Sequence, residues 1–555
     1  MWRSRLVPPR PPPIRTPAVR VLEISACVAL ALLLFAWPLL LDIPLLDPDE
    51  GLHASIAQEM LEHHEWITPS FVGQPFLDKP IFYFWAQTVS LAVLGENEAA
   101  VRLPSLFFGA LGAVATGLLA RDLLGTRAGL IAGAMQATML GPLAQSQAGS
   151  HDVALVPWTT FALLWLRRAD AAASQGMTGQ GRHQSMIQPL ALTSLFLGLS
   201  ILTKGLAGVA LVMVPAVAIL AVERRVTMVR LRCLAACAGV AAVIALPWYV
   251  LMEHAHPGYL RYYFVERHLL GFATGTARHA GRPWWYYVPV LLAGGFPWAL
   301  YLPAAAVRRV WIWLVTGLLF LTVAKVKLWT YALPLFPAIA ILAAHAWTRI
   351  LDDARPNVPR AMRWGVTAHV VAGALSIPAV WLFSRGYGLP SSFALGVCAA
   401  VIAAGCVWAR SQFARGAFQT AWLALAGVIV ATSVAALALV MPTIADSLSA
   451  RDLARYFNAT GTLPVRMLVL DDRIGSFVFY LRQDLRRGLT PGQLVSLPIP
   501  ALAREIDDAA PGTLVAVRER RAWLVERAFR SCGSVYVRAR QFRLYHAERL
   551  QACGD

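Results

Sequence analysis

The sequence predicts a multi-pass α-helical membrane protein that ends in a small α/β domain, and three observations support this fold class. Of the 555 residues, 57% are hydrophobic and 14% are charged, whereas about 25% of residues are charged in an average soluble domain. The apolar residues form a long series of runs that suit membrane helices. Residues 442–555 are more polar and contain segments that alternate apolar and polar residues, as strands do.

The first apolar run, residues 21–41, follows a basic and proline-rich N-terminus. Because no small-residue cleavage site follows this run, we interpret it as an uncleaved first span and not as a signal peptide. The positive-inside rule places the basic N-terminus in the cytoplasm. The acidic segment that comes next, residues 45–80, is therefore predicted to lie on the outer side.

The apolar runs between residues 21 and 441 number one more than the charge pattern allows. If residues 81–95 crossed the membrane, every later arginine-rich loop would lie outside, against the positive-inside rule. We therefore predict thirteen spans, with residues 81–94 as an interfacial or re-entrant helix rich in aromatic residues. The predicted domains are a transmembrane domain, residues 1–441, with outer loops at 43–102 and 252–283, and an outer α/β domain, residues 442–555.

The net charge of +18 could indicate a nucleic-acid partner, but most of the basic residues lie between apolar runs. That distribution is typical of cytoplasmic loops next to anionic lipid, so we predict membrane lipids and no nucleic acid as partners. Five of the seven cysteines lie in apolar runs. Cys532 and Cys553 lie in the polar C-terminal part and could pair if that part is in an oxidising compartment.

Three carboxylates at the predicted outer surface are candidates for chemistry. Asp49 and Glu50 follow the first span, and Asp152 begins a later one. An acidic pair at a helix end is often only a cap or a solvated loop. A carboxylate beside lipid is costly, however, unless it is paired or used. Two carboxylates from separate loops would suit general-base work on an acceptor hydroxyl.

Several lysines also lie on the outer side, against the usual charge bias. For a single lysine, snorkelling to the interface is the alternative interpretation. As a group, they are candidates for holding an anionic ligand such as a lipid phosphate. They are Lys79, Lys204, Lys325 and Lys327.

The long outer loop at residues 252–283 is rich in histidine, arginine and aromatic residues. Glu266 and His268 could ligate a metal ion together with Asp78, since carboxylate and imidazole are ordinary ligands. The alternative is an aromatic belt with an interfacial histidine.

Together, these motifs resemble bacterial polyprenyl-phosphate-dependent glycosyltransferases of the GT-C fold, similar to aminoarabinose-to-lipid A transferases and protein O-mannosyltransferases. The resemblance covers about residues 20–345 and involves many motifs in order. They include DPDEGLHASIAQEM, QPFLDKPIFYFWAQ, GENEAAVRLPS, SHDVALV, LTKGLAG, HPGYLRYYFVERHLL, RPWWYYVPVLLAGGFPW and KVKLWTYALPLFPA.

The resemblance implies a sugar donor carried on undecaprenyl phosphate, and a site that faces the periplasm from the bacterial inner membrane. The sugar would be 4-amino-4-deoxy-L-arabinose and the acceptor lipid A or a related envelope molecule. Asp49 would be the leading catalytic carboxylate, with Glu50 beside it and Asp152 near the acceptor. Lys79 would contact the donor phosphate with help from Tyr331.

The resemblance also implies a metal site shared by Asp78 and His268, which would hold zinc or magnesium. Asp78 stands where relatives usually have Glu, and Gly271 where many have Arg. Other cations would then complete the phosphate site, and the candidates are Arg102, Arg267, Arg278 and Arg282. His53 stands where relatives often have Tyr.

The predicted reaction is a single displacement at the anomeric carbon, which inverts its stereochemistry. No nucleotide is expected, because the sequence has no P-loop and no Rossmann fingerprint. A protein O-mannosyltransferase-like enzyme is the alternative within this class. A lipid or solute transporter is the alternative of another class, but transporters often show internal repeats and charges at mid-membrane, and neither is evident here.

Overall fold

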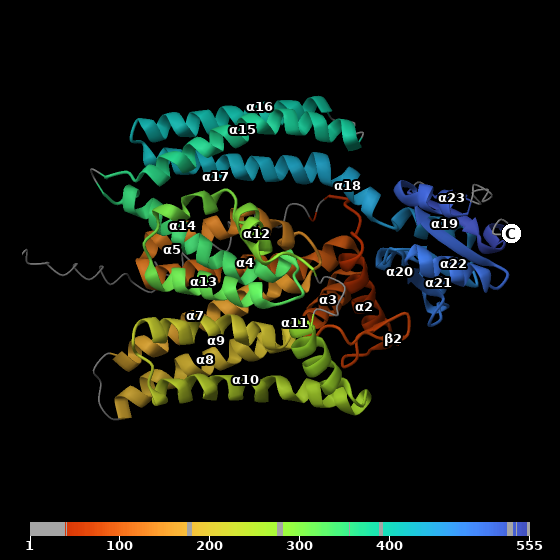
Figure 1. Cartoon of the computed structure of the whole chain (residues 1–555), viewed down its shortest axis with the longest axis horizontal. Coiled ribbons are helices and arrows are strands. Elements are labelled where there is room, and N and C mark those ends of the chain that lie inside the picture. The colour runs from red at the N-terminus through yellow and green to blue at the C-terminus, as the bar shows by residue number, and fades with distance from the viewer. Residues whose placement is uncertain are drawn as a thin grey trace, which may run out of the picture.

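The computed structural model describes residues 39, 41–174, 180–274, 281–353, 356–387, 392–529, 537–539 and 541–551. Long helices lie side by side along the longest axis of the molecule, and a small mixed domain lies at one end of them (Figure 1). Nearly all of the first predicted span, residues 21–41, lies outside the described residues, as do Arg278, Cys532 and Cys553.

Seven helical segments among the described residues are long and apolar enough to cross a membrane, or eight if one pair bent by 108° counts as a span. The prediction of a multi-pass helical protein is therefore confirmed, while the number thirteen stays a prediction. The seven are Glu98–Leu124 (α4), Ser185–Lys204 in α8, Met228–Ala255 (α10), Trp329–Leu351, Arg360–Leu382 in α15, Phe393–Ala414 in α16 and Phe418–Leu448; the bent pair is Trp284–Gly294 with Trp298–Ala304.

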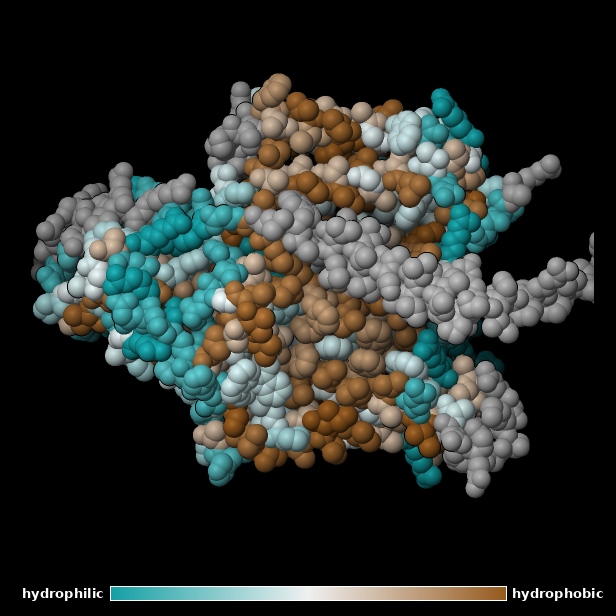
Figure 2. Space-filling view, turned by 180° about the vertical axis from the view of Figure 1, so that it is seen from behind, coloured by the Kyte–Doolittle hydropathy of each residue, from teal (hydrophilic) through white to brown (hydrophobic). Residues whose placement is uncertain are grey.

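Further helices of this part, some of which overlap the spans named above, have the following bounds. They are α2 (Asp49–His63), α3 (Phe82–Leu94), α5 (Thr126–Thr138), α6 (Leu140–Ser146), α7 (His151–Ser174), α8 (Gln180–Lys204), α9 (Leu206–Val222), α12 (Tyr287–Gly294), α13 (Arg308–Val323), α14 (Phe336–Leu351), α15 (Arg360–Tyr387), α16 (Ser392–Ala414), α17 (Phe418–Ala435) and α18 (Met441–Leu448). Figure 2 shows apolar residues gathered over the middle of this part and hydrophilic residues over the C-terminal domain, as expected for a membrane-embedded surface.

Helix α4 shows how local sequence sets the elements. Asn97 caps its first turn by accepting from the Ala100 N–H at 2.9 Å, and Gly125 ends it with a φ of 97°. Along its length, Gly117 and Gly129 let the backbones of α4 and α5 approach closely. A Cβ added at Gly129 would lie 2.7 Å from the Gly117 carbonyl oxygen, which is the small-residue packing typical of membrane helices.

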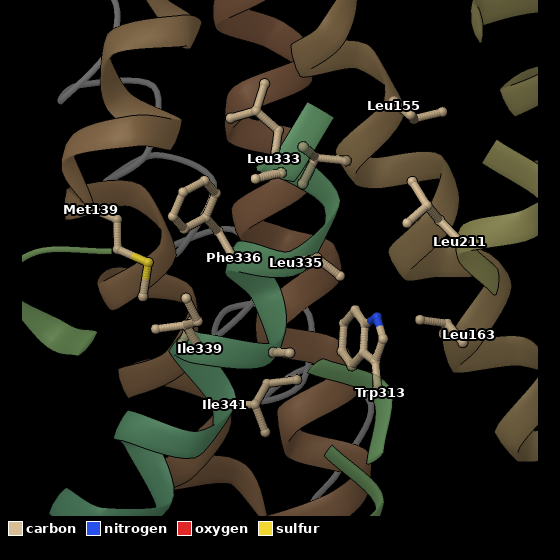
Figure 3. Packing of buried hydrophobic residues seen from close by; sticks show 14 of the residues in the cluster. Met139, Leu155, Leu163, Leu211, Trp313, Leu333, Leu335, Phe336, Ile339 and Ile341 are labelled. Carbon is tan, nitrogen blue, oxygen red and sulfur yellow. The ribbon is translucent and has the colours of Figure 1, made fainter. Parts of the chain in front are cut away.

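Helix α14 lies in the centre of the core, and its apolar side chains face those of neighbouring helices (Figure 3). Leu335, just before this helix, and Phe336, Ile339 and Ile341 within it are fully buried. The Phe336 ring lies against the backbone of Gly294, where an added Cβ would approach the ring carbon Cζ to 2.5 Å. This helix therefore fixes the neighbouring elements by packing.

Arginine-rich loops that we predict to be cytoplasmic lie close together in the structure. Arg225 donates to Asp170 at 2.9 Å, and Arg309 pairs with Glu223 at 2.5 Å. These ion pairs join the end of α7, the loop after α9 and the start of α13. The structure thus brings together basic loops that the charge pattern assigns to one side.

Helix α3 lies at the other end, beside α2 and next to the C-terminal domain (Figure 1). It has 13 residues, so it is about 20 Å long, well short of the ~30 Å hydrocarbon core of a bilayer. Its Trp85 side chain donates to the Trp66 carbonyl oxygen at 2.7 Å. These features agree with an interfacial helix.

The C-terminal part is an α/β domain with a five-stranded sheet of order β4-β3-β5-β7-β6. β3 runs parallel to β4 and β5, whereas β7 is antiparallel to β5 and β6. Its elements are α19 (Arg451–Thr460), β3 (Arg466–Leu470), α20 (Gly475–Tyr480), α21 (Gln483–Arg487), β4 (Leu494–Leu497), α22 (Ile499–Asp507), β5 (Thr513–Arg518), α23 (Ala522–Ala528), β6 (Val537–Ala539), β7 (Phe542–His546) and α24 (Ala547–Gln551).

Strand β3 is buried on both faces of this sheet. Met467 and Val469 pack in one apolar cluster, and Leu468 and Leu470 in another. Alternate residues of a strand point to opposite faces, so two layers of helices can cover one short sheet. The α/β fold predicted for this region is present.

Candidate active site

Asp49 is the first residue of α2 and lies exposed at the helix N-terminus. Its carboxylate has no hydrogen-bond or ion-pair partner in the part of the chain that the structure describes. His53 and Lys79 are close enough to interact with it electrostatically. Asp49 is thus a carboxylate that remains available to a ligand.

Glu50, the next residue, is in the opposite situation. Its two oxygens accept from Arg102 Nε at 2.8 Å and Nη2 at 3.0 Å. They also accept from the backbone N–H groups of Leu46 at 2.8 Å and Gly149 at 3.0 Å. With Glu50 only 4% exposed, this geometry favours a structural role over the chemical one that its position suggested.

The guanidinium of Arg102 is occupied by the same ion pair with Glu50. Besides Glu50, its guanidinium donates to the carbonyl oxygens of Ile43 at 2.7 Å and Pro44 at 3.0 Å, and the residue is 6% exposed. An arginine that is buried and bidentate to a carboxylate is not free to bind phosphate. It holds α4 against the segment that precedes α2.

Asp152 lies at the start of α7 and forms an ion pair with Lys204 at the end of α8. The Lys204 Nζ donates to Asp152 Oδ1 at 2.6 Å and lies 3.9 Å from the centre of the Tyr331 ring. The structure therefore joins the predicted residues Asp152, Lys204 and Tyr331 into one cluster.

Lys79 interacts with both carboxylates. Burial lowers the pKa of its ammonium group, but the attraction of Asp152 and Asp49 outweighs this effect and leaves the pKa above its usual value. Lys79 therefore keeps its positive charge at neutral pH, although it is partly buried.

Arg267 and Asp78 form a second cluster on the same side. The Arg267 Nη2 lies 3.0 Å from Asp78 Oδ2, and the Tyr262 hydroxyl donates to Asp78 Oδ1 at 2.7 Å. Arg267 is 41% exposed at its side chain, so it has donors left for a ligand. Repulsion from Arg267 also acts on the Lys79 ammonium, so both cations contribute positive charge to this side of the site.

Arg267 lies on a π-helix, Arg261–Leu270, and its neighbour His268 faces elsewhere. The His268 Nδ1 is 2.8 Å from the Tyr263 carbonyl oxygen, and its Nε2 is 3.4 Å from that of Lys204. Asp78 and His268 thus contact different partners. Among the described residues, no group of three or more His, Cys, Asp or Glu side chains could hold a metal ion; the zinc or magnesium site at Asp78 and His268 stays a prediction.

The remaining predicted cations differ in how available they are. Arg282 is exposed, with its guanidinium carbon 5.3 Å from the centre of the Tyr286 ring. Lys325 is also exposed. Lys327 is buried and donates to the Ala324 carbonyl oxygen, so its ammonium closes a local turn and is not directed at a ligand.

Two further residues of this region had no assigned role in the sequence-based prediction. The rings of His53 and His151 lie 4.3 Å apart, and burial lowers the pKa of His53. His151 is buried, and neither of its ring nitrogens has a hydrogen-bond partner in the described chain. His53 lies four residues after Asp49 on α2, which is the helical spacing that could have linked it to the site.

One accessible carboxylate, a second held by a lysine, and several cations thus lie at one end of a bundle of membrane helices. This arrangement suits transfer of a group away from a phosphate carried on a lipid. Fold and site together define a membrane-embedded glycosyltransferase of the GT-C type.

Comparisons with known proteins agree. Residues 78–250 match the family model of dolichyl-phosphate-mannose-protein mannosyltransferases. An undecaprenyl phosphate-α-4-amino-4-deoxy-L-arabinose arabinosyl transferase of Aeromonas salmonicida is 31% identical over 391 residues, which are 67% of this chain and 68% of that protein. The enzyme of the same name from Erwinia tasmaniensis is 32% identical, over 62% of each chain. The chain belongs to the family of undecaprenyl phosphate-α-4-amino-4-deoxy-L-arabinose arabinosyl transferases.

The fold has a solved counterpart over almost its whole length. The crystal structure of ArnT from Cupriavidus metallidurans bound to undecaprenyl phosphate has a TM-score of 0.73 and 22% identity, and covers 96% of this chain and 98% of that one. The apo state of the same protein matches with the same TM-score. The predicted GT-C fold is thereby confirmed.

Proposed function

We propose that this protein transfers 4-amino-4-deoxy-L-arabinose from undecaprenyl phosphate to lipid A or a related envelope acceptor. The observation that carries the proposal is the unpaired Asp49 carboxylate next to the Lys79 cation. The relatives named above are arabinosyl transferases of this donor, and family membership supports the same donor here.

In this mechanism an oxygen of the acceptor attacks the anomeric carbon of the sugar. The bond between that carbon and the phosphate oxygen breaks, and the lipid phosphate leaves with the electron pair. Asp49 orients the acceptor and takes the proton if the attacking group is a hydroxyl. Lys79 and Arg267 stabilise the negative charge of the leaving phosphate, and the single displacement inverts the anomeric centre.

Asp152 and Lys204 have a supporting role in this scheme. Because they pair with each other at 2.6 Å, their charges largely cancel, and the pair fixes the Lys204 ammonium above the Tyr331 ring. Asp152 also attracts Lys79 and so keeps it cationic. The pair therefore acts as a positioning element for the phosphate end of the site.

We place the reaction on the periplasmic face of the bacterial inner membrane, with the C-terminal domain on the same side and thirteen spans in all. Two features support this topology. The arginine-rich loops form ion pairs with one another, as between Arg225 and Asp170. The candidate site and the C-terminal domain lie together at one end of the helices in Figure 1.

The test is transfer by the purified full-length protein in proteoliposomes that contain lipid A and a radiolabelled undecaprenyl-phosphate aminoarabinose. We expect label in lipid A with the wild type and none with Asp49→Asn. Asp508→Asn, which removes an exposed carboxylate from the C-terminal domain, is the matched control and should be active.

The same experiment separates the alternatives. Label that enters a protein acceptor and not lipid A would indicate a protein glycosyltransferase, the activity named in the matched family model. Donor that crosses the bilayer unchanged would indicate a transporter. Wild-type turnover by Asp49→Asn would refute the assignment of Asp49.

A further inference from the structure

We propose that Arg518 of the C-terminal domain is a positioning residue for Asp49, and that it acts through Asp47 and the turn that joins the two aspartates. The inference rests on the proposed function of Asp49. It assigns to the C-terminal domain a part in catalysis that the sequence does not indicate, since Arg518 and Asp47 are separated by 471 positions.

Asp47 is the first link between the C-terminal domain and the turn formed by residues 47–49, which carries Asp49. Its carboxylate accepts from the Ser476 N–H at 2.9 Å and from the Ser476 hydroxyl at 2.6 Å. The Arg518 Nη2 donates to the same carboxylate at 3.3 Å. The Asp47 side chain is fully buried, so these contacts belong to the interior and no substrate can reach them.

Arg518 ties three segments to one another. Its guanidinium donates to the carbonyl oxygens of Ser447 at 2.9 Å, Leu448 at 2.9 Å and Ser449 at 3.2 Å, and it pairs with Asp472. Those carbonyl groups end α18, the last part of a candidate span. Arg518 therefore fixes the turn relative to both the sheet and the membrane helices.

A second contact pins the first turn of α2 directly to α20. A Cβ added at Gly51 would lie 2.2 Å from the Ser476 backbone nitrogen, and one added at Gly475 would lie 2.3 Å from that of Leu52. The two backbones touch because both positions lack a side chain. The Ser55 hydroxyl donates to the Gly475 carbonyl oxygen at 2.7 Å and strengthens the crossing.

Asp49 lies between these two fixed points, two residues after Asp47 and two before Gly51. Its own carboxylate is unpartnered in the described chain, so its position depends on the backbone on either side. Misplacement of a catalytic group by about 1 Å can lower the rate about 100-fold. Loosening the turn should therefore slow the chemical step more than it weakens donor binding.

The test compares Arg518→Met with Arg543→Met in the full-length protein in proteoliposomes. Arg543 lies in the same sheet and pairs with Glu519 and Glu526, but it does not contact the turn. We expect Arg518→Met to lower kcat about 10- to 100-fold with less than about a threefold change in KM for the donor. Arg518→Lys should recover part of the rate, and Arg543→Met should keep the wild-type kcat.

All assays are run below the melting temperature measured for each variant. Because Arg518→Met could fail to fold, Ser476→Ala is the second variant; it removes only the hydroxyl that donates to Asp47 and should also lower kcat, by a smaller factor. Wild-type kcat in Arg518→Met or Ser476→Ala would overturn the proposal, as would an equal loss in Arg543→Met. A wild-type protein that transfers no sugar would instead refute the proposed function, so the two failures are distinguishable.

Discussion

Replacing Glu50 by alanine should destabilise the protein, whereas the same change at Asp49 should remove activity and leave stability unchanged. The two acids are adjacent in sequence, and both are candidates for chemistry there, with Asp49 as the leading carboxylate. In the structure, Glu50 accepts four hydrogen bonds from three residues, and Asp49 accepts none from the described chain.

The magnitude follows from what each substitution leaves behind. Without Glu50, the buried guanidinium of Arg102 keeps two carbonyl partners but loses its counter-charge. Breaking a buried ion pair in this way costs about 3–5 kcal/mol, a large part of the ~5–15 kcal/mol that stabilises a typical domain. Removing the exposed Asp49 carboxylate should change stability by no more than about 0.5 kcal/mol.

The assay is thermal unfolding in detergent, together with sugar transfer measured well below the melting temperature. The double variant Glu50→Gln with Arg102→Met is the control, because it leaves no lone buried charge and its one amide oxygen still accepts from one of the two backbone N–H groups that the carboxylate now holds. It should melt above Glu50→Ala. The reasoning would be refuted if Glu50→Ala melted like the wild type and yet transferred no sugar, or if Asp49→Ala lost as much stability as Glu50→Ala.

Three further predictions concern other parts of the molecule. Replacing Lys79 by glutamine removes charge-assisted hydrogen bonds to phosphate, which are worth about 1.5–3 kcal/mol. In a transfer assay, kcat/KM for the donor should therefore fall about 10- to 100-fold. An unchanged kcat/KM would exclude Lys79 from phosphate binding. Burial raises the pKa of Asp47 to about 7 from 3.8, against the attraction of Arg518. The stability that this group contributes is therefore complete below about pH 3.8, declines as the pH rises and is absent above about pH 7, so the melting temperature of the wild type should fall relative to that of Asp47→Asn over this window. Gly294→Ala places a Cβ 2.5 Å from the Phe336 ring and should cost about 1–3 kcal/mol in thermal unfolding, whereas Gly239→Ala, where the Cβ meets no atom within 4 Å, should not destabilise the protein.

Much of the fold could be predicted because its causes are local. Apolar runs indicate helices, and the alternating segments after residue 441 indicate strands; Met467–Leu470 is a continuous apolar run, as expected of a strand buried on both faces. The charge pattern also brought Asp152 and Lys204 to the same side as Asp49, because the sign of a loop reflects the side of the membrane on which it lies.

The division of labour within the site could not be predicted, because it depends on contacts between residues far apart in the chain. Glu50 forms an ion pair with Arg102, which is 52 positions away. Asp78 contacts Arg267 and Tyr262 instead of His268. Sequence shows which charges are present, but only packing decides which of them cancel and which remain for a ligand.

The π-helix Arg261–Leu270 lets the segment that carries Arg267 differ in length without turning this side chain away. A π-helix closes its hydrogen bonds between residues five apart, one more than an α-helix does, so it rotates less per residue. If one residue before Arg267 were deleted and the segment wound as an α-helix, the larger rotation of about 100° per residue would nearly offset the missing residue. The Arg267 guanidinium would then still face Asp78, with which it now pairs at 3.0 Å.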